Sequence, residues 1–392
     1  MSTHPQTFLV PMTQPNRPIY LDCAATTPID PRVRAKVLHY MDFEFGNAGS
    51  RTHQYGQEAA NAVKHARRQI AAVVEAKPGE VLFTSGATEA NNLALLGLAE
   101  YGKNEGKRHI ISTQIEHKAV LEPLKFLQSE GFEIDLIPPS KTGQIDPNDL
   151  QRYLREDTLL VTIMHVNNET GIVQPIGEIA AILENHSAIY HVDAAQGFAK
   201  ELNLLSESRI DLISVSGHKI HGPMGIGALI ARQNGQVHRK LSPLTFGGGQ
   251  ERGLRPGTLP VPLIVGFGEA AEIAVLEHEK RLSIWSQHRK NIISALDGLP
   301  YRIHGESANN LGNIVNFSIS DLDSDVVILA LKNIASISSG SACTASKSFP
   351  SHVISAMYPE SELASMACRA SWSHLTPPLD PVPIRKALDV LI

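Results

Sequence analysis

The chain has 392 residues, of which 42% are hydrophobic and 19% charged, and its formal net charge is −5. This length exceeds what one compact core usually spans, so we expect two domains. The slightly acidic composition argues against direct nucleic-acid binding, and no apolar run is long enough to cross a bilayer. Residues 1–17 are polar and lack the apolar core of a signal peptide, so we expect a cytoplasmic protein that begins with a loose leader.

Short apolar runs alternate with amphipathic segments through most of the chain. Such alternation predicts an α/β fold with a mostly parallel central sheet covered on both faces by helices. Ligands of these sheets bind at the C-terminal ends of the strands. The expected strands are 81–83, 109–112, 159–166, 189–192, 211–215 and 226–231, with an amphipathic helix over 57–74.

After Pro260 the pattern changes to a long helical stretch over about 265–296, followed by mixed strand and helix character. This change predicts a second, smaller α/β domain. The predicted division is a large domain over 25–270 and a small domain formed by 1–24 together with 271–392.

The three cysteines, Cys23, Cys343 and Cys368, are odd in number and far apart, which fits a reducing compartment rather than a disulfide framework. The sequence has no CxxC and no Cys/His cluster with zinc spacing, so we expect no structural metal.

Lys219 follows the apolar run 211–215 and precedes a glycine-rich segment, 221–227. A lysine at the end of a buried strand suits a Schiff base with an aldehyde cofactor, although a surface lysine in a turn would have a similar local sequence. Asp193 ends the preceding strand, and a buried acid there needs a cationic partner such as a protonated pyridine nitrogen. The alternative for Asp193 is a helix N-cap, which the presence of Lys219 on the next strand disfavours.

Residues 83–92 describe a strand, a turn of small residues and the start of a helix. Amide groups at a helix N-terminus form an anion site suited to a phosphate. A capping box between Thr84 or Ser85 and a later glutamate would produce the same pattern.

With these motifs in this order, the sequence resembles the cysteine desulfurase family, within the class V aminotransferase group of fold-type I pyridoxal-phosphate enzymes. The resemblance runs from about Tyr20 to about Thr376. Its landmarks are 20–28, 45–47, 84–89, 116–120, 165–171, 193–196, 216–219, 247–258 and 338–344.

The resemblance implies pyridoxal 5′-phosphate as cofactor, L-cysteine as substrate and a homodimer. Lys219 would hold the cofactor and move protons, Asp193 would pair with its ring nitrogen, and Gln196 would bond its ring oxygen. His117 would stack on the ring and act as an acid or base. The implied phosphate ligands are Ala87, Thr88, Ser216 and His218, with Thr258 supplied to the neighbouring subunit.

The resemblance also implies that Asn168 lies near the ring oxygen and the substrate carboxylate, and that Arg369 clamps this carboxylate. A guanidinium group suits such a two-point grip. His374 stands where many members have a second arginine, and His221 where many have tyrosine. Arg369 is therefore the expected main anchor.

Almost nothing apolar surrounds Cys343, which predicts an exposed loop rather than a buried thiol. By resemblance, its thiolate would take the substrate sulfur as a persulfide, leave alanine, and pass the sulfur to an acceptor protein. A thiolate is required, and either His117 or Lys347 could help to form it.

The chain ends at Ile392, without the long tail of housekeeping members. We therefore expect a dedicated pathway, such as DNA phosphorothioation or tRNA thiolation, rather than general iron–sulfur cluster assembly. The alternatives are another class V enzyme, an aminotransferase or lyase, which would need no thiol, and a non-catalytic binding protein on the same fold.

Overall fold

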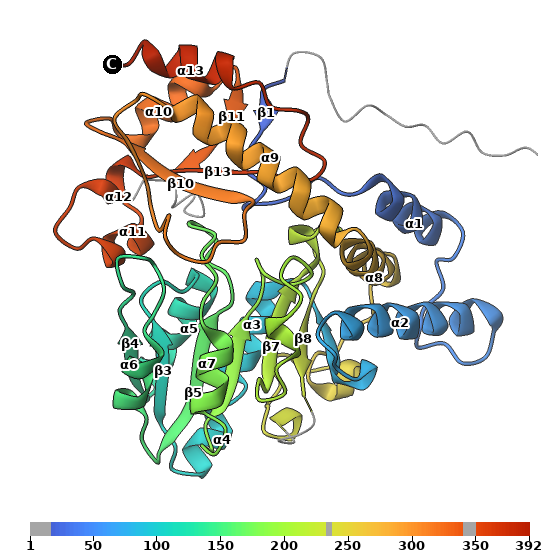
Figure 1. Cartoon of the computed structure of the whole chain (residues 1–392). Coiled ribbons are helices and arrows are strands. Elements are labelled where there is room, and N and C mark those ends of the chain that lie inside the picture. The colour runs from blue at the N-terminus through green and yellow to red at the C-terminus, as the bar shows by residue number, and fades with distance from the viewer. Residues whose placement is uncertain (1–16, 233–236, 340–349) are drawn as a thin grey trace, which may run out of the picture.

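The computed structural model describes residues 17–232, 237–339 and 350–392 (Figure 1). Its centre is a seven-stranded sheet with the spatial order β2–β8–β7–β6–β5–β3–β4. Strand β8 runs antiparallel to both neighbours, and the remaining strands are mutually parallel. The strands are β2 (Val81–Thr84), β3 (His109–Thr113), β4 (Glu133–Ile137), β5 (Thr158–Met164), β6 (Ile189–Asp193), β7 (Leu212–Ser216) and β8 (Gly227–Ala231).

The predicted α/β class and mostly parallel sheet are confirmed, and each of the six expected strands is present. Strand β4 was not expected, because its sequence Glu-Ile-Asp-Leu-Ile alternates polar and apolar residues. It lies at the edge of the sheet, where one face contacts solvent, so it lacks the continuous apolar run of a buried strand.

Helices cover both faces of this sheet, and successive strand residues pack to opposite sides. Val81 and Phe83 belong to one hydrophobic core with helices α2 and α8, whereas Leu82 belongs to another with α3 and α5. The helices around the sheet are α1 (Pro31–Asp42), α2 (Gln54–Val73), α3 (Ala87–Leu96), α4 (Ala99–Asn104), α5 (Lys118–Ser129), α6 (Pro147–Tyr153), α7 (Ile176–Ile182) and α8 (Val261–Leu276).

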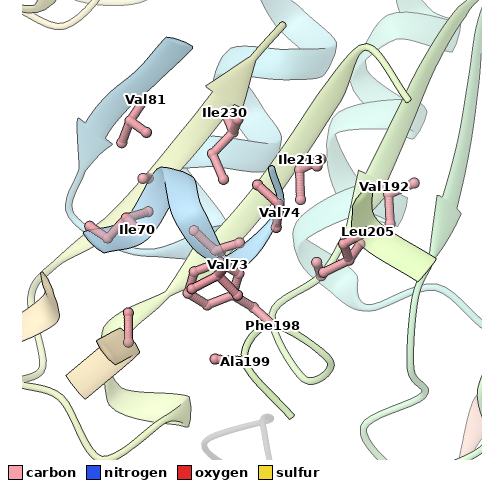
Figure 2. Packing of buried hydrophobic residues seen from close by; sticks show 14 of the residues in the cluster. Ile70, Val73, Val74, Val81, Val192, Phe198, Ala199, Leu205, Ile213 and Ile230 are labelled. Atoms are coloured by element: carbon pink, nitrogen blue, oxygen red, sulfur yellow. The ribbon is translucent and has the colours of Figure 1, made fainter. Parts of the chain in front are cut away.

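Helix α2 provides much of the first core. Figure 2 shows Ile70 and Val73 of α2 among strand side chains that include Ile213 and Ile230. These positions of α2 recur at helical spacing and are buried, as the sequence pattern predicts. The packing holds α2 against the face of the sheet.

A second layer lies above the C-terminal ends of the central strands (Figure 1). Its four-stranded antiparallel sheet has the order β12–β13–β10–β9, and the N-terminal strand β1 pairs in parallel with β11. The strands are β1 (Ile19–Tyr20), β9 (Tyr301–Ile303), β10 (Ile314–Ile319), β11 (Ala335–Ser336), β12 (Ser338–Ser339) and β13 (Cys368–Ser371). The helices are α9 (His278–Leu296), α10 (Ser324–Leu331), α11 (His352–Met357), α12 (Leu363–Met366) and α13 (Pro381–Asp389).

This layer has its own hydrophobic core, which includes Leu21, Trp285, Phe317 and Trp372. The pairing of β1 with β11 brings the start of the described chain into it. Two separate cores are consistent with two domains. The predicted bounds, 25–270 for the large domain and 1–24 with 271–392 for the small one, remain a prediction.

The long helix expected over about 265–296 is two helices. Helix α8 starts at Val261 and ends at Leu276, and α9 starts at His278. Glu277 lies between them with non-helical backbone angles, and its carboxylate binds the guanidinium groups of Arg32 and Arg281. Arg281 is four positions from Glu277, but Arg32 on α1 is 245 positions away, so the local sequence did not contain this second contact.

Among the described residues, no helix combines the length and the apolar character needed to cross a membrane.

Candidate active site

A cavity of ≈ 490 Å³ opens at the C-terminal ends of the parallel strands. This is the position expected for a ligand of such a sheet. The cavity brings together ten of the predicted residues: Ala87, Thr88, His117, Asn168, Asp193, Gln196, Ser216, His218, Lys219 and Arg369. Thr258 is exposed and is not among the lining residues, and Cys343 lies outside the described residues.

Lys219 ends a short 3₁₀ turn, Gly217–Lys219, directly after β7. Its Nζ donates hydrogen bonds to the carbonyl oxygens of Ala24 and Ala25, at 2.6 and 2.8 Å. These residues follow β1, so the N-terminal segment forms one wall beside the lysine. The amine thus lies inside the cavity, where it can reach a bound aldehyde.

The backbone beside Lys219 is packed so closely that it requires glycine. A Cβ atom on Gly227 would lie 2.5 Å from the carbonyl oxygen of Val215 and 2.6 Å from Cα of Gly86. Gly227 therefore lets β8 approach both β7 and the turn before α3. This approach sets the Gly86 turn beside Ser216 at the end of the cavity.

Asp193 ends β6 and is 4% exposed. Its Oδ2 accepts a hydrogen bond from the Asn91 amide at 2.7 Å, and its Oδ1 accepts one from the N–H of Ala195 at 2.9 Å. Both donors are neutral. A buried carboxylate is costly unless a positive charge lies near it, so a cationic ligand atom in the cavity would complete this site.

Another part of the cavity lining consists of groups that can bind an anion. Helix α3 begins at Ala87, and Gly86 at its N-cap makes no side-chain hydrogen bond, so N–H groups of the first turn remain available to a ligand. The alternative capping box on Thr84 or Ser85 is not formed, because the N-cap of α3 is Gly86; the Glu89 carboxylate instead accepts a hydrogen bond from the N–H of Ser85. A phosphate group would fit between the helix N-terminus and the Ser216 hydroxyl.

His218 also lines the cavity, and its Nδ1 lies within hydrogen-bond distance, 3.1 Å, of Thr26 Oγ1. Burial, followed by the neighbouring charge of Lys219, lowers the pKa of His218 to about 4. The ring is therefore neutral near pH 7, and it can offer a phosphate a hydrogen bond but not a charge.

His117 is the N-cap residue of α5, and its Nδ1 accepts the N–H of Ala119 at 3.1 Å. With Nδ1 engaged as an acceptor, the proton of the neutral ring lies on Nε2. Burial lowers the pKa of His117, and the charge of Asp193 partly opposes this effect. Nε2 is thus the ring atom available for stacking contacts or proton exchange in the cavity.

Arg369 in β13 is the cationic anchor, and it is only 2% exposed. Its Nη2 donates to Asp22 Oδ1 at 2.7 Å, and its Nη1 donates to the carbonyl oxygen of Asn168 at 2.9 Å. Within the described part of the chain its buried Nε has no hydrogen-bond partner. A carboxylate entering the cavity can therefore meet an oriented guanidinium group whose Nε–H is still available as a donor.

Three residues beneath or beside this cavity were given no role by the sequence analysis: Asn91, Asp22 and Glu116. Asn91 bonds Asp193, and Asp22 bonds Arg369. Glu116 is fully buried, and its Oε1 accepts from Thr113 Oγ1 and from the N–H of Met164, both at 2.8 Å. Asp22 and Glu116 lie in family landmarks, which was a usable signal, but Asn91 is an ordinary helix residue in the sequence.

The donor set fits pyridoxal 5′-phosphate: a lysine for its aldehyde, a buried acid for its ring nitrogen and a helix N-terminus for its phosphate. The family model described as Aminotransferase class-V matches residues 19–377. The chain therefore belongs to the class V aminotransferase family.

Similarity to individual proteins shows which activity within the class V aminotransferase family this chain has. Cysteine desulfurase IscS of Salmonella paratyphi B is 44% identical over 92% of this chain and 89% of its own length. The solved structure of DndA from Streptomyces lividans is 47% identical, covers 90% of this chain and 99% of its own, and has a TM-score of 0.79. A structure described as SspA in complex with cysteine is 37% identical to this chain and has a TM-score of 0.81. The match covers 92% of this chain and 99% of the other. The chain is thus a cysteine desulfurase, and the predicted family is confirmed.

Proposed function

We propose that this enzyme binds pyridoxal 5′-phosphate in the described cavity and carries the sulfur of L-cysteine as a persulfide on Cys343. The observation that carries the proposal is the convergence of Lys219, Asp193 and Arg369 on one cavity. When bound, the cofactor supplies an aldehyde for the substrate amine and an electron sink for charge that develops at Cα.

The predicted site residues have separate roles in this reaction. Arg369 binds the substrate carboxylate, and Lys219 takes the proton from Cα and returns it. Asp193 keeps the ring nitrogen protonated, Gln196 and Asn168 bond the ring oxygen, and His117 stacks on the ring. The phosphate ligands are Ala87, Thr88, Ser216 and His218, with Thr258 reaching the cofactor of the partner subunit.

Cys343 completes the reaction. Its thiolate attacks the substrate sulfur, so a sulfur–sulfur bond forms while the carbon–sulfur bond breaks, and a proton at the former sulfur-bearing carbon gives alanine. One thiol and one cysteine become one persulfide and one alanine, so the atoms and electrons balance. The persulfide sulfur then passes to an acceptor protein.

The flanks of residues 340–349 support this role for Cys343. Ser339 pairs with Cys368 in β13, next to Arg369, and Ser338 donates to Asp22. Pro350 lines a second cavity of ≈ 410 Å³ that shares His117 and Asn168 with the first. The chain on both sides of Cys343 therefore lies next to the substrate site.

The homodimer is part of the proposal, and exposed apolar side chains support it. Phe246 is 88% exposed, Phe45 69% and Met224 64%. Exposed apolar side chains of this size are typical of surfaces that a partner covers. Met224 also lines the cavity, and Thr258 is exposed, so a second copy on this side could complete the phosphate site.

The acceptor pathway and the cytoplasmic location are the finer parts of the proposal. Among the expected pathways we favour DNA phosphorothioation, which the similarity to DndA supports. Transfer of labelled sulfur from the persulfide to a purified candidate acceptor tests the pathway.

The central experiment measures alanine and sulfide release from L-cysteine with a thiol reductant. Cys343→Ala should abolish both products while the absorption band of the bound cofactor stays intact. Cys368→Ala, which removes a buried thiol, is the matched control and should keep activity. Full turnover by Cys343→Ala would contradict the persulfide mechanism and favour another class V reaction that needs no thiol.

A further inference from the structure

Lys200 is a buried lysine with an unusual environment. It lies in the turn after β6, four residues beyond Gln196, and is 6% exposed. Its Nζ donates to Oε1 of Gln196 at 3.3 Å. Among the described residues no carboxylate forms an ion pair with it. A buried cation without an acidic partner is costly, so a fold that keeps one needs a reason beyond packing.

The partner of Lys200 lines the active-site cavity. Gln196 Nε2 donates to the carbonyl oxygen of Ala24 at 2.7 Å, and the same oxygen accepts from Lys219 Nζ at 2.6 Å. The Ala24 carbonyl can only accept, and the Lys200 amine can donate, so the Gln196 amide has one orientation. Its oxygen faces Lys200, and its nitrogen faces Ala24 at the wall of the cavity. An amide nitrogen has two N–H donors, and Ala24 uses one of them.

We propose that Lys200 is a positioning residue for the cofactor: it orients and polarises the Gln196 amide so that an N–H meets the ring oxygen of bound pyridoxal phosphate and stabilises that oxygen as an anion. The inference rests on the proposed function and extends it to a residue outside the cavity lining. Donation to Gln196 Oε1 strengthens the N–H groups of the same amide, because hydrogen bonds in a chain polarise one another.

The charges around Lys200 are consistent with this role. Burial is the main cause that lowers the pKa of Lys200 to about 7, and Lys219 and Arg281 act in the same direction. Cys23 opposes them, but burial raises the pKa of that thiol to about 11, so it is uncharged near neutral pH. Lys200 is therefore partly charged near pH 7, and its effect on the ring oxygen should fade as the pH rises.

Replacing Lys200 by methionine separates this role from simple packing. Methionine keeps the length of the side chain but removes the charge and the donor. If Lys200 serves the cofactor at a cost to the fold, the cofactor-free Lys200→Met protein should unfold at the same temperature as the wild type or higher. If Lys200 were only structural, the unfolding temperature should fall.

The test compares Lys200→Met, Lys200→Arg and a control, Lys332→Met, which removes an exposed lysine. The first readout is the pH midpoint at which the absorption band of the bound cofactor changes. Loss of a nearby positive charge favours a protonated cofactor, so the midpoint should rise by about 0.5 pH units or more in Lys200→Met. The second readout is the affinity for pyridoxal phosphate, which should fall several-fold. Lys200→Arg should restore both readouts toward the wild type, and the control should change neither.

Two outcomes would overturn the inference: an unchanged midpoint and affinity in Lys200→Met, or a lower unfolding temperature without any change in the cofactor band. If Lys200→Met does not fold, Lys200→Gln, which removes the charge but keeps a neutral donor, is compared with the wild type by the same two readouts. Absence of a cofactor band in the wild type would instead overturn the proposed function itself, which distinguishes the two failures.

Discussion

Asp22 and Arg369 lie 347 positions apart in the sequence, yet Arg369 Nη2 donates to Asp22 Oδ1 at 2.7 Å. Asp22 follows β1, and Arg369 belongs to β13. Asp22 also accepts a hydrogen bond from Ser338, shortly before the segment that contains Cys343. One carboxylate therefore connects the substrate anchor with the start of that segment.

This arrangement predicts that Asp22 acts on the substrate through the orientation of Arg369. Asp22→Ala should raise KM for L-cysteine by about tenfold, because the guanidinium group loses one of its two fixed contacts. Asp22→Asn keeps an acceptor and removes a negative charge, so its KM should equal that of the wild type or fall below it. Alanine formation at a series of cysteine concentrations measures both values. Equal KM in Asp22→Ala and wild type would contradict the prediction.

Asn91 should determine how tightly the cofactor is held. Asn91→Ala removes a 2.7 Å hydrogen bond to buried Asp193 and should weaken the affinity for pyridoxal phosphate by about tenfold. The neighbouring Asn92 donates to the Thr88 carbonyl within the same helix and has no hydrogen bond to Asp193 among the described residues, so Asn92→Ala is the matched control. Titration of cofactor-free protein with pyridoxal phosphate measures the difference. Similar losses in the two variants would show that the effect comes from the helix and not from Asp193.

Glu116 should make the stability of the protein depend on pH. Burial raises the pKa of Glu116 to about 8, from an ordinary value of 4.5, so the folded state keeps a proton that the unfolded state releases. The contribution of Glu116 to stability is fully present below pH 4.5 and is lost as the pH rises toward 8, by up to about 1.4 kcal/mol per pH unit. Glu116→Gln does not titrate, so its stability should improve relative to the wild type over this range.

Denaturant unfolding at several pH values between 5 and 8 checks this prediction, with the exposed Glu122→Gln as control. A constant difference between Glu116→Gln and the wild type would mean that Glu116 is already ionised in the folded protein.

Phe246 should contribute to the proposed dimer. The wild type should sediment at twice the mass of one chain, and Phe246→Asp should shift it toward the monomer and speed up the loss of cofactor, because Thr258 of the partner would leave the phosphate site. Leu329→Asp introduces the same charge at an exposed position of α10 and should leave the dimer intact. A wild-type monomer at micromolar concentration would exclude the dimer.

The sequence was sufficient for those features that depend on local pattern. The buried strands are continuous apolar runs, and α2 has apolar residues at helical spacing, so both follow from periodicity. Asp193 and Lys219 could be identified because Asp193 ends such a strand and Lys219 closely follows the next one, and strand ends meet at one edge of a parallel sheet. Ten of the predicted site residues accordingly line one cavity.

The tertiary structure decided which distant groups meet, because the free energy of a buried charge or amide depends on its neighbours in space and not in sequence. Glu277, at the break between α8 and α9, binds Arg32 of α1, and the partner of Asp193 is Asn91 on α3. The amide of Gln196 is oriented between Lys200 and Ala24. The contacts of Glu277 with Arg32, of Asp193 with Asn91 and of Gln196 with Ala24 join residues far apart in the sequence, so no local pattern contains them. The sequence therefore determined the sheet and the reactive residues, whereas the fold decided how each reactive side chain is oriented and charged.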